Sequence, residues 1–287
     1  MTALDSKQYK EAERQSWNSV AAGWQKWWKT IERGTEKVSR RLVELAEIKP
    51  GSRVLDIATG MGEPALTAAN RVGKSGHVLA TDISSQMLSF AKQRAISLGL
   101  QDVIEFKEGD AESIDLPSST FDAALCRWGL MLLPDPKAGL SNIYGSLVNG
   151  GHLAVAVWAS PEKVPFIFVP MNTLLKETNS PSPPPGTPGP FSMSDQNSLM
   201  NSYLSSGYKD PSIESMNVVL DFDSPDDFTT FTIEHGGPAI QKILGGQTNE
   251  RRKEILKAVS KAAERYVDNT MGKVILENEA MLIVGRK

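Results

Sequence analysis

Apolar and polar positions alternate in the middle of the chain so as to predict strands and helices in turn. Short apolar runs suit buried strands, and longer amphipathic stretches with capping residues suit helices. Repeated strand–helix units require a parallel sheet with helices on both faces. The predicted strands are about 52–57, 77–81, 103–107, 121–127 and 152–158, with helices after Pro64, from Ser84 or Ser85 to Gly99, and after Pro136.

Helical patterns also precede this core. Over residues 5–30, apolar positions recur at three- and four-residue spacings on one helix face. A second helix is expected from Thr35 to Ala46, before Pro50-Gly51. The residues on the apolar face of the first helix are Trp17, Val20, Ala21, Trp24, Trp27 and Trp28.

After the core we expect a helical cap and the last strands. Serine caps, prolines at first helical positions and a proline-rich loop set the predicted boundaries. The expected elements are a helix at 164–176, a loop at 180–190, a helix capped by Ser194 that ends at Gly207, a strand at 212–221, helices from Ser224 to 267, and a strand at 274–285. The predicted division is 1–48 as a helical lid, 49–160 as a ligand-binding core, and 161–287 as cap helices and final strands that complete the same sheet.

A glycine turn carries the clearest chemical signal. Val54 to Ile57 reads as a buried strand, and Gly60 and Gly62 allow a tight turn that a ligand can approach closely. Asp56 lies at the carboxyl end of this strand, where open α/β sheets bind ligands. The next strand ends in Asp82, at a spacing that suits a carboxylate accepting hydrogen bonds from ribose. Together they predict a nucleoside-containing cofactor.

The turn favours one cofactor class over another. Its pattern, Gly60-x-Gly62-x-Pro64, differs from the G-x-G-x-x-G of dinucleotide sites. A carboxylate at Asp56 would repel a pyrophosphate and favour a cation. S-adenosylmethionine carries an ammonium and a sulfonium but no phosphate. An NAD(P)-dependent oxidoreductase stays open as an alternative.

Composition narrows the class of protein. The 287 residues are 40% hydrophobic with a net charge of −3, and no long basic run favours nucleic-acid binding. Cys126 is the only cysteine, so no intrachain disulfide or thiolate metal site forms, and no histidine cluster has metal-ligand spacing. The longest apolar run, 153–159, is too short to span a bilayer. We expect a soluble cytoplasmic protein without metal or stable membrane insertion; the oligomeric state is not predicted.

Further motifs follow the turn in order. They are Gly109-Asp110-Ala111-Glu112, Phe121 to Trp128, and Leu147-Val-Asn-Gly-Gly151. The whole set resembles the class I S-adenosylmethionine-dependent methyltransferases, and most closely the small-molecule members such as the ubiquinone and menaquinone biosynthesis enzymes. Asn149 replaces a usual proline. Ala58 stands where the family often has glycine, and alanine is tolerated there if its φ is negative.

The resemblance implies a fold, a cofactor and a site. The fold is a Rossmann-like sheet, mostly parallel with the last strand antiparallel, with an N-terminal helical lid and a helical cap insertion. The cofactor is S-adenosylmethionine, with S-adenosylhomocysteine as product. The implied cofactor-binding residues are Trp17, Trp24, Asp56, Ala58, Thr59, Gly60, Gly62, Asp82, Ile83, Met87, Asp110, Ala111, Glu112, Arg127 and Trp128.

The expected reaction is methyl transfer by in-line displacement to a small, partly apolar molecule. Such a reaction needs alignment and a dry pocket more than a catalytic triad. The acceptor is expected between Arg127-Trp128 and the cap. The aromatic and apolar residues expected near it are Phe166, Phe168, Met171, Phe228 and Phe231. Arg127 and His235 are the only catalytic candidates. The remaining alternative is a cofactor-binding protein of this fold that does not transfer methyl groups.

Overall fold

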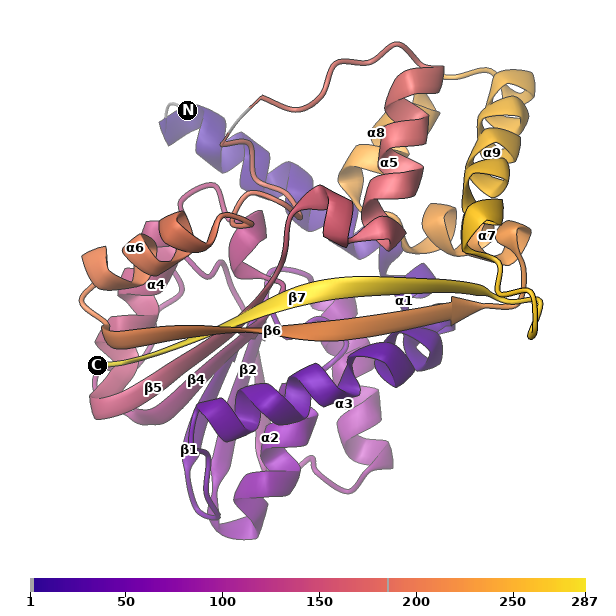
Figure 1. The fold of residues 1–287 in the computed structure, drawn as a ribbon. Helices are drawn as coiled ribbons and strands as arrows, with labels where there is room; N and C mark the ends of the chain where they lie inside the picture. Colours follow the sequence, from indigo (N-terminus) through magenta and orange to yellow (C-terminus); the bar gives the residue numbers. More distant parts are fainter. Residues whose placement is uncertain (1–2, 185) are drawn as a thin grey trace.

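The computed structural model describes residues 3–184 and 186–287 and centres on a seven-stranded sheet (Figure 1). Its strand order is β3-β2-β1-β4-β5-β7-β6. Neighbouring strands from β3 to β5 pair in parallel, and β7 runs antiparallel to β5 and β6, which confirms the predicted sheet. The strands are β1 (Arg53–Ile57), β2 (His77–Asp82), β3 (Ile104–Glu108), β4 (Phe121–Arg127), β5 (Leu147–Trp158), β6 (Lys209–Phe222) and β7 (Val274–Arg286).

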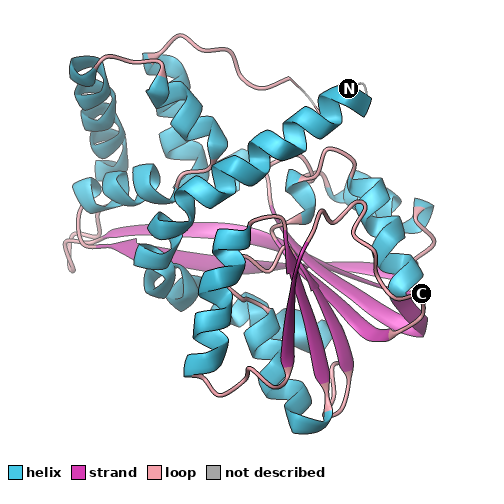
Figure 2. Ribbon diagram, turned by 180° about the vertical axis from the view of Figure 1, so that it is seen from behind, coloured by secondary structure: helices cyan, strands magenta, loops and turns pink. Residues whose placement is uncertain are grey.

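Helices cover both faces of the sheet (Figure 2). The strand order reverses between β1 and β4, so right-handed crossovers place α2 and α3 on one face and α4 on the other. The helices are α1 (Ala3–Leu45), α2 (Ala65–Val72), α3 (Ser85–Ser97), α4 (Pro136–Ser146), α5 (Pro165–Glu177), α6 (Gln196–Ser205), α7 (Pro225–His235), α8 (Pro238–Gly245) and α9 (Asn249–Ala263).

The core lies where helices sandwich the sheet. Every residue of 153–159 is buried, because this strand is covered on both faces and needs no polar alternation. β5 begins five residues earlier than predicted. Leu147 already pairs with Phe121, and a register shift follows, so the expected turn at 147–151 is the irregular start of the strand.

The N-terminal segment is a single helix, and the predicted break near Gly34 was wrong. Gly34 serves close packing rather than termination. A Cβ there would lie 2.5 Å from the carbonyl oxygen of Val219 in β6. The glycine therefore lets α1 cross the edge strand closely without ending the helix.

Most helices of the cap lie together over the last two strands. α5, α7, α8 and α9 gather above β6 and β7, towards the ends that reach beyond the rest of the sheet (Figure 1). Ser224 caps α7 as predicted, accepting a hydrogen bond of 3.0 Å from the Asp227 N–H. Asp195, not Ser194, caps α6. The described part of the proline-rich segment, 180–184 and 186–190, contains no helix or strand, and Pro185 lies outside the described residues.

Over the described residues, no helix combines the length and apolar character that crossing a bilayer requires.

Candidate functional site

The turn after β1 is held by two buried carboxylates. Asp56 is inaccessible to solvent, and its Oδ2 accepts a hydrogen bond of 3.0 Å from the backbone N–H of Ala65, the first residue of α2. Asp82 Oδ2 accepts a hydrogen bond of 2.8 Å from the N–H of Gly60, and its Oδ1 accepts one of 2.8 Å from the N–H of Ser84. The ends of β1 and β2 are therefore joined through the turn.

Burial changes the acidity of both groups. Loss of solvent raises the pKa of Asp56 to about 8 and that of Asp82 to about 6. The nearby Thr59 side chain and the Ala65 N–H oppose this effect at Asp56, and backbone N–H groups oppose it at Asp82, in both cases only in part. A cation beside either carboxylate would favour its ionised form.

Two non-glycine residues at this edge have left-handed backbone. Ala58 has φ 55°, so the condition under which alanine is readily tolerated there is not met, and Trp128, directly after β4, has φ 61°. Each such residue costs on the order of 1 kcal/mol or more, and such strain tends to collect at functional sites. Gly129 makes room for the turn, because a Cβ on it would lie 2.4 Å from Ala58 Cβ.

Unsatisfied polar atoms gather around the same edge. In the described part of the chain, Asp56 Oδ1, Thr59 Oγ1, Trp128 Nε1 and Trp24 Nε1 are buried without a hydrogen-bond partner. Buried polar atoms in native proteins nearly always have a partner. The edge therefore presents both acceptors and donors to a polar ligand, and its residues fit the ammonium and hydroxyl groups of an adenosyl cofactor.

α1 covers the turn with its aromatic face. Trp17 and Trp24 pack in one apolar cluster with Met61 of the turn and Met87 of α3. The two indole rings meet edge to face at 6.0 Å. The predicted residues Trp17, Trp24 and Met87 are thus brought together over the glycine turn.

Polar contacts fix α1 to the strand ends. Lys10 Nζ lies 2.7 Å from Asp110 Oδ2 and also contacts Glu112. Although partial burial opposes the charged form, hydrogen bonds to these carboxylates raise the pKa of Lys10. Asn18 accepts 2.7 Å from the Ser84 hydroxyl, which itself caps α3. The lid is therefore attached beyond both β2 and β3.

Glu112 joins the loop after β3 to the start of α4. Glu112 Oε1 accepts 2.8 Å from the Asp135 N–H at the start of α4. Ala111 is buried beneath the same loop, and Ile83 is half-buried after β2. The loops after β2 and β3 are thus ordered parts of the edge.

Arg127 is bound by the lid. Its guanidinium donates 2.8 Å to Ser39 Oγ and 3.1 Å to Thr35 Oγ1, and it pairs with Glu32 at 3.4 Å. A buried arginine needs a charged or carbonyl partner, and Glu32 supplies the charged one here. These contacts place Arg127 as an anchor for α1, and its neighbour Trp128 stacks on Trp158 at 4.4 Å.

His235 is the one histidine near the lid. Its ring lies 4.0 Å from that of Trp24 and is stacked on Phe231 at 4.5 Å. Removal from water lowers its pKa to about 3, so it is neutral. By contrast, Phe228 and Phe231 pack with Phe222 in a solid core, so they do not line an open acceptor pocket as expected.

The one cysteine lies in the core of the sheet, away from solvent. Cys126 is fully buried in β4, and burial raises the pKa of its thiol to about 12. No group of three metal-ligating side chains that could hold an ion occurs within residues 3–184 and 186–287.

Sequence comparison finds a known domain in the first half of the chain. Residues 54–151 match a family described as methyltransferase domain. The ubiquinone/menaquinone biosynthesis C-methyltransferase UbiE of Pseudomonas savastanoi is 32% identical over 145 residues, which cover 50% of this chain and 57% of that one. The Stenotrophomonas maltophilia UbiE is 37% identical over 116 residues, 40% of this chain and 46% of that one. The chain thus spans about half the length of the curated relatives it matches.

Solved structures share the fold. The YcgJ protein of Bacillus subtilis aligns with TM-score 0.59 and 20% identity, covering 88% of this chain and 98% of that one. A second structure is the Haemonchus contortus phosphoethanolamine N-methyltransferase 2, solved with phosphomonomethylethanolamine and S-adenosylhomocysteine. It aligns with a TM-score of 0.51 and 17% identity, covering 86% of this chain and 51% of that one. The [4+2]-cyclase SpnF aligns with a TM-score of 0.53 and 18% identity, covering 89% of this chain and 82% of that one. Over residues 54–151 the chain therefore carries a methyltransferase domain, and it resembles the UbiE enzymes over about half of its length.

Proposed function

We propose that this protein binds S-adenosylmethionine at the carboxyl edge of β1, β2 and β4 and transfers its methyl group to a small, partly apolar molecule. The observation that carries the proposal is the set of buried polar atoms without partners at this edge, contributed by Asp56, Thr59, Trp128 and Trp24. They stand beside a turn whose backbone is held in left-handed conformations at Ala58 and Gly60. Such an edge is suited to a polar, cationic ligand.

The roles of the residues follow from their positions. Asp56 would receive the ammonium group, and Asp82, already turned towards the Gly60 N–H, would accept from ribose hydroxyls. Asp110 would accept from the adenine amino group beside Lys10. The remaining predicted residues, from Ile83 and Met87 to Ala111 and Glu112, would complete the walls.

The bound cofactor would supply an electrophilic methyl group on a sulfonium. The protein's own contribution is to align the acceptor and exclude water. α1, by packing Trp17 and Trp24 over Met61, covers the turn and keeps it dry. No general base is assigned, because Arg127 is engaged by Glu32 and His235 is a weak base with a pKa of about 3.

The aromatic column Trp128–Trp158–Phe166 supports an apolar acceptor. Trp158 stacks on Trp128 and meets Phe166 of α5 edge to face at 5.1 Å. This column leads from the edge of the sheet into the cap. We assign the lid to residues before about 48 and the acceptor side to the cap after 160.

A transfer assay tests the proposal. The protein is incubated with S-adenosylmethionine and a panel of phenols, quinols, amines and carboxylic acids, and S-adenosylhomocysteine is quantified. Acceptor-dependent formation of the product supports methyl transfer. Cofactor binding without product across the panel would instead favour other chemistry on this fold, as in the cyclase SpnF, whose fold the chain shares.

A further inference from the structure

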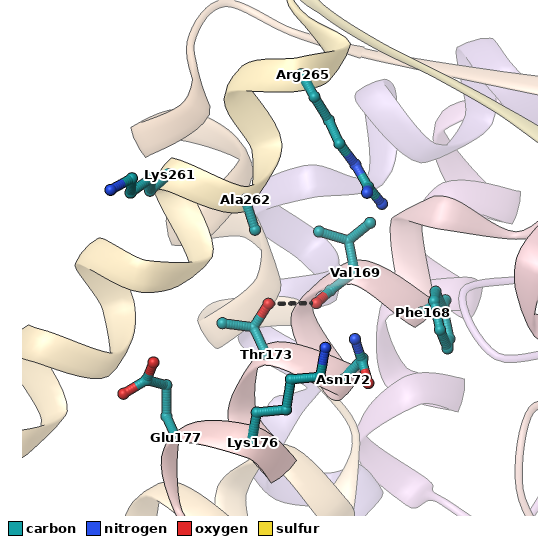
Figure 3. A pocket seen from close by; sticks show the side chains of 9 residues that line it. All are labelled: Phe168, Val169, Asn172, Thr173, Lys176, Glu177, Lys261, Ala262 and Arg265. Carbon is teal, nitrogen blue, oxygen red and sulfur yellow. Dashed lines mark hydrogen bonds between the residues drawn. The ribbon is translucent and has the colours of Figure 1, made fainter.

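A separate hollow lies between α5 and α9, within the cap (Figure 3). Its volume is about 280 Å³, slightly below the range of about 300–1,000 Å³ that is usual for ligand pockets, which suits a small molecule. The residues that line it are Phe168, Val169, Asn172, Thr173, Lys176, Glu177, Lys261, Ala262 and Arg265.

Two cations from opposite walls face the hollow. In Figure 3 Lys176 and Arg265 reach into the hollow from opposite sides, with Val169 between them in this view. The Asn172 amide lies beside the Lys176 ammonium, whereas Lys261 points away. Within the described residues, neither Lys176 nor Arg265 forms an ion pair. Arg265 donates one hydrogen bond, of 2.8 Å, to the Tyr266 hydroxyl and keeps its other donors available.

The carboxylate and the hydroxyl that line the hollow already have other partners. Glu177, the one carboxylate among the lining residues, pairs with Arg251 at 2.9 Å. The Thr173 hydroxyl donates 2.8 Å to the carbonyl oxygen of Val169, the dashed contact in Figure 3. Lys176 and Arg265, both exposed to solvent, therefore keep their charges without an ionic partner among the described residues.

Apolar groups form the rest of the wall. Phe168, Val169 and Ala262 offer contact to carbon, and Lys176 and Arg265 offer charge-assisted donors. A few placed donors on an apolar wall are typical of small-molecule sites.

We propose that this hollow binds a small organic molecule with one oxyanion group, a carboxylate or a phosphate monoester, and an apolar part. Lys176, Arg265 and Asn172 hold the oxyanion, and Phe168 packs against the apolar part. This site is distinct from the cofactor edge and goes beyond the proposed methyl transfer.

Titration calorimetry with phenyl phosphate, benzoate and inorganic phosphate tests the site. We expect saturable binding of phenyl phosphate or benzoate, tighter than that of inorganic phosphate, and the better of the two decides between a phosphate and a carboxylate. Lys176→Gln and Arg265→Gln should each weaken binding by about tenfold or more. The matched control, Lys261→Gln, removes a lysine of the same hollow that points away and should leave affinity unchanged.

Folding and cofactor binding are followed in parallel. Urea unfolding and S-adenosylhomocysteine titration of each variant should match the unaltered protein, so failure of this site and failure of the proposed function are distinguishable. Absence of saturable binding by the unaltered protein would overturn the inference. An equal loss in Lys261→Gln would also overturn it, because it would indicate a diffuse charge effect.

Discussion

Gly129 and Ala58 fit together only because Gly129 has no side chain. A Cβ on Gly129 would lie 2.4 Å from Ala58 Cβ and 3.0 Å from Cys126 Sγ. The contact joins the exit of β4 to the turn after β1, at the point where the strand order reverses. The conformation of the turn thus depends on the backbone of the neighbouring strand.

Gly129→Ala should therefore displace the turn. We expect a loss of about 1–3 kcal/mol in the free energy of unfolding and weaker binding of S-adenosylhomocysteine. Gly145→Ala is the matched control, since nothing lies within 4 Å of a Cβ there and its helical position favours alanine. Urea unfolding and calorimetry measure both effects. Equal behaviour of the two variants would contradict the role of Gly129.

Lys10→Met should loosen the N-terminal part of α1. Lys10 joins α1 to Asp110 and Glu112, and a partly buried network of this kind contributes on the order of 1 kcal/mol. Hydrogen exchange of amides at 7–16 should become several-fold faster, whereas Lys7→Met, at an exposed site on the same helix, should not change it. Unchanged exchange in Lys10→Met would show that the ion pairs do not hold the lid.

Arg127→Met should destabilise the fold through Glu32. Removal of the guanidinium leaves the Glu32 carboxylate, only 16% exposed, without its partner. We expect about 3 kcal/mol lower free energy of unfolding, as for other broken buried pairs. The double variant Arg127→Met/Glu32→Gln should recover part of this loss. If it were as unstable as the single variant, Glu32 would not be the source of the cost.

Asp56 gives the ligand-free protein a pH dependence. Its folded pKa is raised from 3.8 to about 8 by burial, so the folded state binds more protons than the unfolded state within that window. Its contribution to stability is present below pH 3.8 and is lost as pH rises towards 8. Urea unfolding across this window should show a smaller decline for Asp56→Asn. A decline of equal size in both proteins would assign it to other groups.

The affinity for the cofactor should also depend on Asp56, but it should rise with pH where the stability falls. A cationic cofactor end favours ionised Asp56, so affinity for S-adenosylhomocysteine should rise by up to about tenfold per pH unit as pH approaches 8. Calorimetry at several pH values measures this rise, which Asp56→Asn should abolish. A flat profile for the unaltered protein would mean that Asp56 stays protonated in the complex.

The sheet could be predicted from sequence because each strand has a local signature. Apolar runs, the glycine turn and the acidic strand ends predict the parallel strands and the helices between them. The extent of α1 could not be predicted, because the pattern gave two helices with a break between residues 30 and 35. Gly34 lies in that break, and its packing against the distant carbonyl of Val219 is visible only in the structure. Local patterns contain no information about such a contact.

The lid's polar anchors were missed for the same reason. Continuing the aromatic face of α1 in both directions reaches Lys10 and Glu32, at helical spacing from Trp17 and Trp24. Nothing in the sequence pairs them with Asp110 and Arg127, about 100 residues away. The left-handed φ of Ala58 likewise depends on Gly129, a neighbour only in space.

Calorimetric titration of the unaltered protein with S-adenosylmethionine, S-adenosylhomocysteine and NADH tests the central claim most directly. We predict micromolar binding of both adenosyl ligands, none of NADH, and weaker adenosyl binding by Asp82→Ala. Well-folded protein that binds NADH, or that binds neither adenosyl ligand, would contradict the assignment of the β1–β2 edge as a site for S-adenosylmethionine.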